Sequence, residues 1–290
     1  MKINYLALVM LSLSLLLACE AFEEEEIDNL SEGRIAIIGH GGVGFPSPEN
    51  ERTMNSWEGI NKAIFGLGAD GIEVDVQISA DGKAMLYHDE RLQTLTNCGG
   101  CVYEYSAEEL EDCHYRLELD ERLSDASRLV RLERVFDLFA EGERPPWLLL
   151  DIKLFSPCPL EVEKSVFLSN FSEELLSLIE RYKATDWVIV QTSSLEFIQK
   201  LSAGNADLKL MLLISRLDAQ ILALLKDYSL YGLGSENSRL SAAEISQIHD
   251  RGLRVVLWGI GSRSKAVEAI QKSPDFIETD NIVLLQQMLR

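Results

Sequence analysis

Short apolar runs alternate with helical patterns along almost the whole chain, and this alternation limits the fold more than any other feature. Strands alternating with helices are typical of βαβ units and a parallel sheet. We expect strands at residues 34–38, 71–78, 84–87, 147–152, 187–191, 208–214, 255–258 and 276–279, and a strand or a loop at 231–235. The favoured fold is therefore an α/β protein, with a single TIM (β/α)8 barrel over residues 31–290.

The N-terminus carries an export signal. An apolar run at residues 5–17 follows Lys2 and is shorter than the about 20 residues that span a bilayer. The end of this run together with the two residues after it, Leu16-Leu17-Ala18-Cys19, resembles the lipobox of bacterial lipoproteins. We expect residues 1–18 to be a lipoprotein signal peptide and Cys19 to carry the lipid. The alternative is an ordinary signal peptide with a coincidental cysteine.

The residues after Cys19 predict an acidic tether. Residues 19–30 include four consecutive glutamates, which indicate a solvated linker between a lipid and the barrel. An acidic linker does not attract anionic lipids, so the acyl chains would hold the protein to the membrane, either in the periplasm or at the cell surface. The formal net charge of −20 argues against a nucleic-acid partner. We expect a monomer.

Four further cysteines lie in the mature chain: Cys98, Cys101, Cys113 and Cys158. In an oxidising compartment they indicate disulfides, with three connectivities that the sequence does not separate. The alternative is a zinc site formed by the first three cysteines and His114. Most of these residues fall in a small insertion, about residues 90–128, after the third expected strand.

Acidic residues lie on or at the ends of two expected strands. Glu73 and Asp75 are two residues apart, so their side chains point to one side of the strand at residues 71–78. Inside a barrel, two adjacent carboxylates need a cation, and their hard oxygens suit Mg²⁺ or Ca²⁺. The alternative is that they face solvent. Asp151 repeats the pattern after three leucines, although a plain strand-end acid would look the same.

Two histidines each follow an apolar strand. His40 precedes two glycines, which allow a ligand to approach the backbone closely, and His88 precedes Asp89, which can fix its tautomer. A single histidine at a strand end is more often structural, but two beside an acidic pair favour acid–base catalysis. His114 and His249 are expected to be surface or packing residues.

Several motifs resemble the glycerophosphodiester phosphodiesterases in order and spacing. They are Gly39-His40-Gly41-Gly42, the stretch from Gly68 to Val76, Asp81-Gly82 and His88-Asp89. Weaker matches follow at Leu129-Val130-Arg131-Leu132-Glu133, Leu150-Asp151-Ile152-Lys153, Trp258 and Thr279-Asp280. The resemblance spans the mature domain and implies a barrel of the phospholipase C-like phosphodiesterase type.

The resemblance also implies roles for individual residues. His40 and His88 would be the general acid and base. Glu73, Asp75 and Asp151 would bind the divalent cation, and the substrate or its phosphate would contact Lys153, Gly41 and Trp258. The expected reaction hydrolyses a glycerophosphodiester to an alcohol and glycerol 3-phosphate, and the nucleophile is either water or a substrate hydroxyl.

Three departures from the family pattern matter. Gly41 stands where the family usually has an arginine that binds the phosphate, so Lys153 or another cation such as Arg52 would take part of that role. Asp151 replaces the usual glutamate. The family's Pro-Glu-Asn-Thr motif has two candidates, residues 48–50 by letters and Asn55-Ser56 by spacing, and we favour the second.

These departures leave two alternative functions. Relatives with the same barrel that act on lysophospholipid or sphingolipid headgroups also lack this arginine. A catalytically inactive barrel that binds a phosphate ester is the other alternative, although the retained histidines and acids argue against it.

Overall fold

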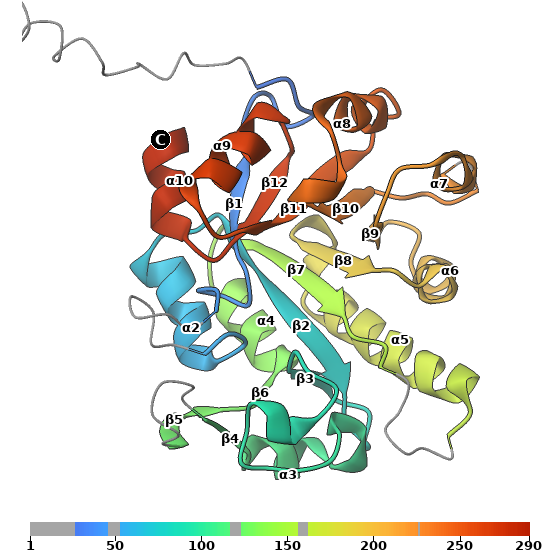
Figure 1. Cartoon of the computed structure of the whole chain (residues 1–290). Coiled ribbons are helices and arrows are strands. Elements are labelled where there is room, and N and C mark those ends of the chain that lie inside the picture. Colours follow the sequence, from blue (N-terminus) through green and yellow to red (C-terminus); the bar gives the residue numbers. More distant parts are fainter. Residues whose placement is uncertain (1–26, 46–52, 117–122, 156–161, 226) are drawn as a thin grey trace, which may run out of the picture.

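Eight parallel strands form a closed barrel in the computed structural model, which describes residues 27–45, 53–116, 123–155, 162–225 and 227–290 (Figure 1). Each strand pairs in parallel with the next, and the last pairs with the first. The strands in ring order are β1 (Ala36–Gly39), β2 (Gly71–Ile78), β7 (Trp147–Ile152), β8 (Val188–Thr192), β9 (Lys209–Leu213), β10 (Gly232–Glu236), β11 (Arg254–Ile260) and β12 (Phe276–Thr279). The predicted TIM barrel is confirmed.

Helices cover the outside of this barrel. They are α2 (Trp57–Asn61, continued by the π-helix η1, Lys62–Gly66), α4 (Leu132–Ala140), α5 (Lys164–Arg181), α6 (Leu195–Gly204), α7 (Ala219–Leu224), α8 (Ala242–His249), α9 (Arg263–Gln271) and α10 (Ile282–Leu289). In α4 the buried residues Leu132, Val135, Phe136 and Phe139 recur at helical spacing, so one stripe packs onto the strands. Two 3₁₀ turns, η4 (Ala184–Asp186) and η5 (Asn237–Arg239), connect other elements. No helix of the described ranges is long and apolar enough to cross a membrane.

Apolar side chains fill the N-terminal part of the barrel interior. The members of this plug are Ala36, Ile38, Leu149, Ile189, Met211, Val256 and Phe276, with Trp147 and Tyr231 packed against them. Gly71 lets β2 approach the start of β7 closely, since a Cβ on Gly71 would lie 2.3 Å from the Trp147 carbonyl oxygen. The polar residues of the interior are therefore confined to the C-terminal ends of the strands, where TIM barrels carry their active sites.

Two segments settle the strand count. Residues 231–235, expected as a strand or a loop, contribute to barrel strand β10. The stretch expected at residues 84–87 forms β3 (Ala84–Leu86), which pairs antiparallel with β2 and with β6 (Val130–Arg131) and lies outside the closed ring. It carries the chain from β2 back toward the mouth of the barrel.

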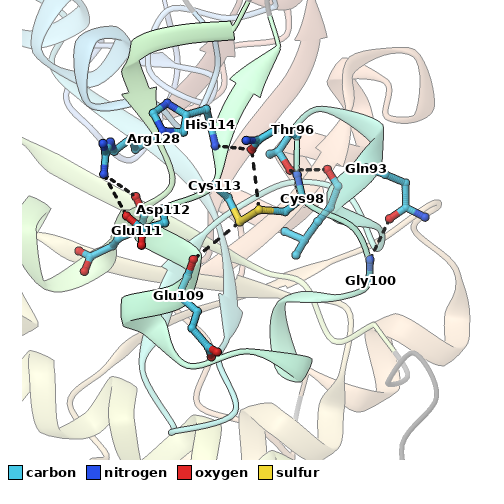
Figure 2. The surroundings of a disulfide bond; sticks show 12 residues. Gln93, Thr96, Cys98, Gly100, Glu109, Glu111, Asp112, Cys113, His114 and Arg128 are labelled. Atoms are coloured by element: carbon cyan, nitrogen blue, oxygen red, sulfur yellow. Dashed lines mark hydrogen bonds and ion pairs between the residues drawn. A yellow bond between two sulfur atoms is a disulfide. The ribbon is translucent and has the colours of Figure 1, made fainter.

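The insertion after β3 packs around an apolar cluster of its own, at the end of the molecule opposite α8 and α9 (Figure 1). It contains η2 (Leu92–Thr94), η3 (Val102–Glu104), α3 (Ala107–Glu111), β4 (His114–Arg116) and β5 (Leu123–Arg128). Figure 2 shows the disulfide between Cys98 and Cys113, with Cα atoms 5.6 Å apart. Cys101 is also disulfide-bonded. Because these thiols are oxidised, they do not form the alternative zinc site. Cys158, Cys19 and the expected signal peptide lie outside the described residues.

Candidate active site

A cavity of about 420 Å³ opens at the C-terminal ends of the barrel strands. Six residues that the sequence analysis singled out line it: His40, Glu73, His88, Asp151, Lys153 and Trp258. They lie on, or directly after, β1, β2, β3, β7 and β11. These segments are far apart in sequence and meet only because the barrel closes. Asp75 and Gly41 lie beside the cavity and contact residues that line it.

Three carboxylates cluster at one wall of this cavity. Glu73 and Asp75 on β2 are 2% and 1% exposed, Glu73 lines the cavity, and Asp75 is in register with Asp151 on β7. One oxygen from each of the three lies within 4.8 Å of the others. Burial and the neighbouring Asp75 charge raise the pKa of Glu73, and burial raises the pKa of Asp151. Such a buried anionic cluster fits a hard divalent cation.

The ammonium group of Lys153 contacts two carboxylates of this cluster. Its Nζ lies 2.9 Å from Asp75 Oδ1 and 2.6 Å from Asp151 Oδ2. Burial alone would lower the pKa of Lys153, but the two carboxylates raise it above its usual value. Lys153 is therefore charged at neutral pH and presents an ammonium to the cavity beside the triad.

Asn55 holds Asp75 in place. The Asn55 amide donates to Asp75 Oδ2 at 2.6 Å, and its carbonyl accepts from the Asp75 backbone N–H at 3.0 Å. Ser56, the next residue, caps the N-terminus of α2 through the Gly59 N–H. Of the two candidates for the family's asparagine motif, Asn55-Ser56 thus contacts the carboxylate cluster through Asn55, and residues 48–50 lie outside the described residues.

Gly41 occupies a position that does not admit a side chain without movement. Its φ is +53°, and a Cβ there would lie 2.5 Å from the Cβ of Met54. Its backbone N–H donates to Glu73 Oε2 at 2.9 Å. Among the described residues no arginine lines the cavity, and Arg52 lies outside that part of the chain. Gly41 therefore contributes a backbone donor to Glu73 and no side chain to the cavity.

His40 is oriented by a carboxylate from the last strand connection. Its Nδ1 lies 2.8 Å from Asp280 Oδ1, which leaves Nε2 free to face the cavity. Phe45 packs edge-on against the imidazole, with the two ring centroids 5.3 Å apart. Burial alone would lower the pKa of His40, but the Asp280 hydrogen bond and the charges of Glu73 and Asp280 raise it to about 10. A divalent cation on the carboxylates would offset the Glu73 charge and reduce this shift.

His88 is held by both its side chain and its backbone. Its Nδ1 lies 2.9 Å from Asp89 Oδ1, the neighbour that the sequence suggested. Gln77, on β2, donates to the backbone carbonyls of Tyr87 at 2.9 Å and Asp89 at 2.8 Å, on either side of His88. These bonds fix the segment that brings His88 to the cavity, and Gln77 was not identified from the sequence.

Three acids that line the cavity received no role from the sequence. Glu278 lines the cavity, accepts from Gln191 Nε2 at 2.9 Å, and has its pKa raised to about 7 by burial. Glu236 lines the cavity from β10, and no role was assigned to Asp280. Glu278 and Asp280 repeat the spacing of two residues seen in Glu73 and Asp75, and this signal predicts that both point into the barrel.

A closed barrel with two histidines facing a carboxylate cluster at its open end has the equipment of a phosphoric diester hydrolase. The chain belongs to the glycerophosphoryl diester phosphodiesterase family, whose model matches residues 46–284. The possible metal triad, Glu73, Asp75 and Asp151, agrees with the metal dependence of this family, without establishing the ion.

Individual relatives agree with this assignment. A glycerophosphodiester phosphodiesterase of Caldanaerobacter subterraneus subsp. tengcongensis is 25% identical over 88% of this chain and 97% of its own length. A phosphodiesterase of Oleispira antarctica, solved with its product sn-glycerol-3-phosphate, superposes with a TM-score of 0.72 at 17% identity, covering 87% of this chain and 95% of that one. A glycerophosphodiester phosphodiesterase of Parabacteroides distasonis superposes with a TM-score of 0.69 at 19% sequence identity. The match covers 88% of this chain and 96% of that one. The two structures show that the barrel fold is shared.

Proposed function

We propose that the protein hydrolyses glycerophosphodiesters to an alcohol and glycerol 3-phosphate, with a divalent cation held by Glu73, Asp75 and Asp151. The observation that carries this proposal is the carboxylate triad in the same cavity as two histidines that are each oriented by an aspartate. The family and the glycerol 3-phosphate complex of the Oleispira antarctica relative support the choice of substrate.

The two histidines perform opposite proton transfers. His88 accepts the proton of the attacking water as its oxygen bonds to phosphorus. His40, kept protonated by Asp280, donates to the departing alcohol oxygen as the phosphorus–oxygen bond breaks. One proton is taken up and one is released, so the net reaction consumes one water. Asp280 and Asp89 fix the ring orientations through Nδ1 and stabilise the charged imidazolium forms.

The remaining polar groups bind and position the phosphodiester. A divalent cation, when bound, would neutralise phosphate charge and orient the diester for in-line attack. Lys153 provides a further positive charge at the same wall, while Asn55 and the Gly41 N–H keep Asp75 and Glu73 oriented as ligands. Lys153 and the cation would therefore supply the positive charge of the guanidinium that the family usually carries.

The test is an assay of glycerol 3-phosphate release with added Ca²⁺ or Mg²⁺. His40→Ala and His88→Ala should each lower kcat by a factor on the order of 10² to 10⁴. His114→Ala, in the insertion, is the matched control and should leave activity near that of the parent. Chelation should abolish activity and added metal should restore it. Undiminished turnover by His40→Ala would overturn the mechanism, and activity that survives chelation would overturn the metal assignment.

The lysolipid alternative is examined by the same assay. Phe45, which is 51% exposed beside His40, gives the cavity an apolar element at its mouth. Hydrolysis of choline lysolipids without hydrolysis of glycerophosphocholine would favour a headgroup phosphodiesterase. The opposite pattern supports the glycerophosphodiester as substrate.

We also propose that the protein is exported and lipidated at Cys19, on the basis of the lipobox-like sequence. Metabolic labelling with a fatty acid should mark the parent protein and not Cys19→Ser. Equal labelling of the two would contradict lipidation at this residue.

A further inference from the structure

A second cavity, of about 700 Å³, opens at the N-terminal ends of the barrel strands. Strands β1, β7, β11 and β12 each contribute their first residue to its lining. Ala36 and Phe276 of the apolar plug, with Trp147 packed against them, form an apolar floor. The reacting groups of the proposed hydrolysis lie at the other end of the barrel, as in TIM barrels generally. This second cavity therefore has no part in that reaction.

Positive charge gathers in this cavity, although the protein as a whole has a formal net charge of −20. Among the described residues, three arginines and two aspartates line it: Arg34, Arg144, Arg254, Asp70 and Asp275. What the cavity offers to a ligand depends on which of these charges are already paired within the protein.

Both aspartates are engaged by cationic side chains or histidine. Asp70 Oδ1 lies 2.8 Å from Arg34 Nη2 and 2.7 Å from Arg290 Nη2, so two guanidiniums share one carboxylate. Asp275 is fully buried, and its Oδ2 lies 3.0 Å from His249 Nε2. The aspartates therefore do not cancel the charges of the remaining two arginines.

Those two arginines, Arg144 and Arg254, have no acidic partner among the residues that the structure describes. The Arg254 guanidinium lies over the Tyr231 ring, with Cζ 4.8 Å from the ring centroid, and its hydrogen bond to the Leu30 carbonyl is long, at 3.5 Å. Stacking orients the guanidinium plane and leaves N–H groups on its edge for an anion. Arg144 is exposed and precedes Pro145, which restricts its backbone to extended conformations.

We propose that this cavity binds a phosphate monoester, with the phosphate at Arg144 and Arg254 and the organic part on the apolar floor. A phosphate monoester carries a charge of about −1.5 to −2 at neutral pH and three acceptor oxygens, which suit more than one guanidinium. A carboxylate has one charge and two oxygens, and a single guanidinium satisfies it. The apolar floor favours an ester over inorganic phosphate, because the organic group buries apolar surface there.

Calorimetric titration with phenyl phosphate tests a soluble ester as the ligand. The full-length protein is titrated in EDTA, so that no divalent cation remains at the carboxylate triad and the anionic active site repels phosphate. We expect a single class of site. Arg144→Gln and Arg254→Gln should each weaken the association roughly tenfold or more, because each removes a charge-assisted hydrogen-bond donor. Benzoate should bind several-fold more weakly, and equal binding of benzoate would contradict the choice of a phosphate.

Arg263→Gln is the matched control, because it removes one positive charge from an exposed residue of α9 outside the cavity. It should bind phenyl phosphate as the parent does. Thermal unfolding checks that each variant is folded, and the exposed Arg144 gives a variant whose stability should match the parent.

Vesicles distinguish a soluble ester from a lipid headgroup. Phosphatidic acid presents the same phosphate monoester on a membrane, and phosphatidylcholine vesicles are the reference, since a lipid anchor would add equally to both. Binding of phenyl phosphate that both arginine variants weaken assigns the site to soluble esters. Preference for phosphatidic acid that both variants lose, without binding of phenyl phosphate, assigns it to lipids. Binding of neither probe, or binding that neither arginine variant weakens, would overturn the proposal.

Discussion

Replacing Asn55 should destabilise the barrel through the loss of two buried hydrogen bonds to Asp75. Both residues are at most 1% exposed, and the bonds measure 2.6 and 3.0 Å. A bond to a charged partner contributes about 1.5–3 kcal/mol and a neutral one about 0.5–1.5 kcal/mol. Asn55→Gly should therefore lower the free energy of unfolding by roughly 2–4 kcal/mol, since glycine accepts the φ of +60° without strain.

Comparing Asn55→Ala with Asn55→Gly separates the effect of the lost hydrogen bonds from the effect of the backbone conformation. It loses the same two bonds and adds about 1 kcal/mol for a Cβ in the left-handed region. For a domain of this size each kcal/mol corresponds to about 2–4 °C, so thermal unfolding followed by circular dichroism should show shifts on the order of 5–15 °C, with alanine the lower. An Asn55→Gly protein that melts within about 1 °C of the parent would refute the reasoning.

Three further predictions concern the site and the insertion. Asp280→Asn should lower the pKa of His40 from about 10, so the alkaline limb of the kcat/KM profile should move to lower pH, and an unmoved limb would count against the assignment. Gly41→Ala should lower the free energy of unfolding in urea by about 2–3 kcal/mol, because residue 41 has a φ of +53° and the added Cβ would overlap Met54. Equal stability of the two proteins would contradict this crowding. Replacing Cys98 and Cys113 by serine removes a disulfide between residues 15 apart in sequence and should lower the free energy of unfolding by about 3 kcal/mol. An unchanged urea midpoint without reductant would contradict this stabilisation.

The barrel was predictable because the apolar period of most strands is strong, and the exceptions have physical causes. β10 was ambiguous because Gly232 and Gly234 remove the apolar pattern that marks a strand. Their interior positions are crowded: a Cβ on Gly232 would lie 2.2 Å from the Arg254 carbonyl oxygen. The stretch at residues 84–87 has the composition of a strand, but its composition does not show that it pairs antiparallel to β2 and lies outside the ring.

The site was predictable where its residues are close in sequence and not where the fold joins distant ones. Glu73 and Asp75 could be placed on one face from their spacing alone. The partner of His40 lies 240 residues away, and only the pairing of β12 with β1 brings Asp280 to it. The tight packing at Gly41 likewise depends on Met54, a contact that the sequence does not reveal.

The apolar plug in the lower barrel has a consequence for the order of events during turnover. Its members, from Ala36 to Phe276, are at most 9% exposed, so the barrel has no channel through its axis. Substrate and both products therefore enter and leave through the same opening, at the C-terminal ends of the strands. In the proposed reaction, glycerol 3-phosphate would bind at the triad and block this opening to the next diester. It should consequently inhibit in competition with substrate, and its departure sets an upper limit on the rate of the cycle.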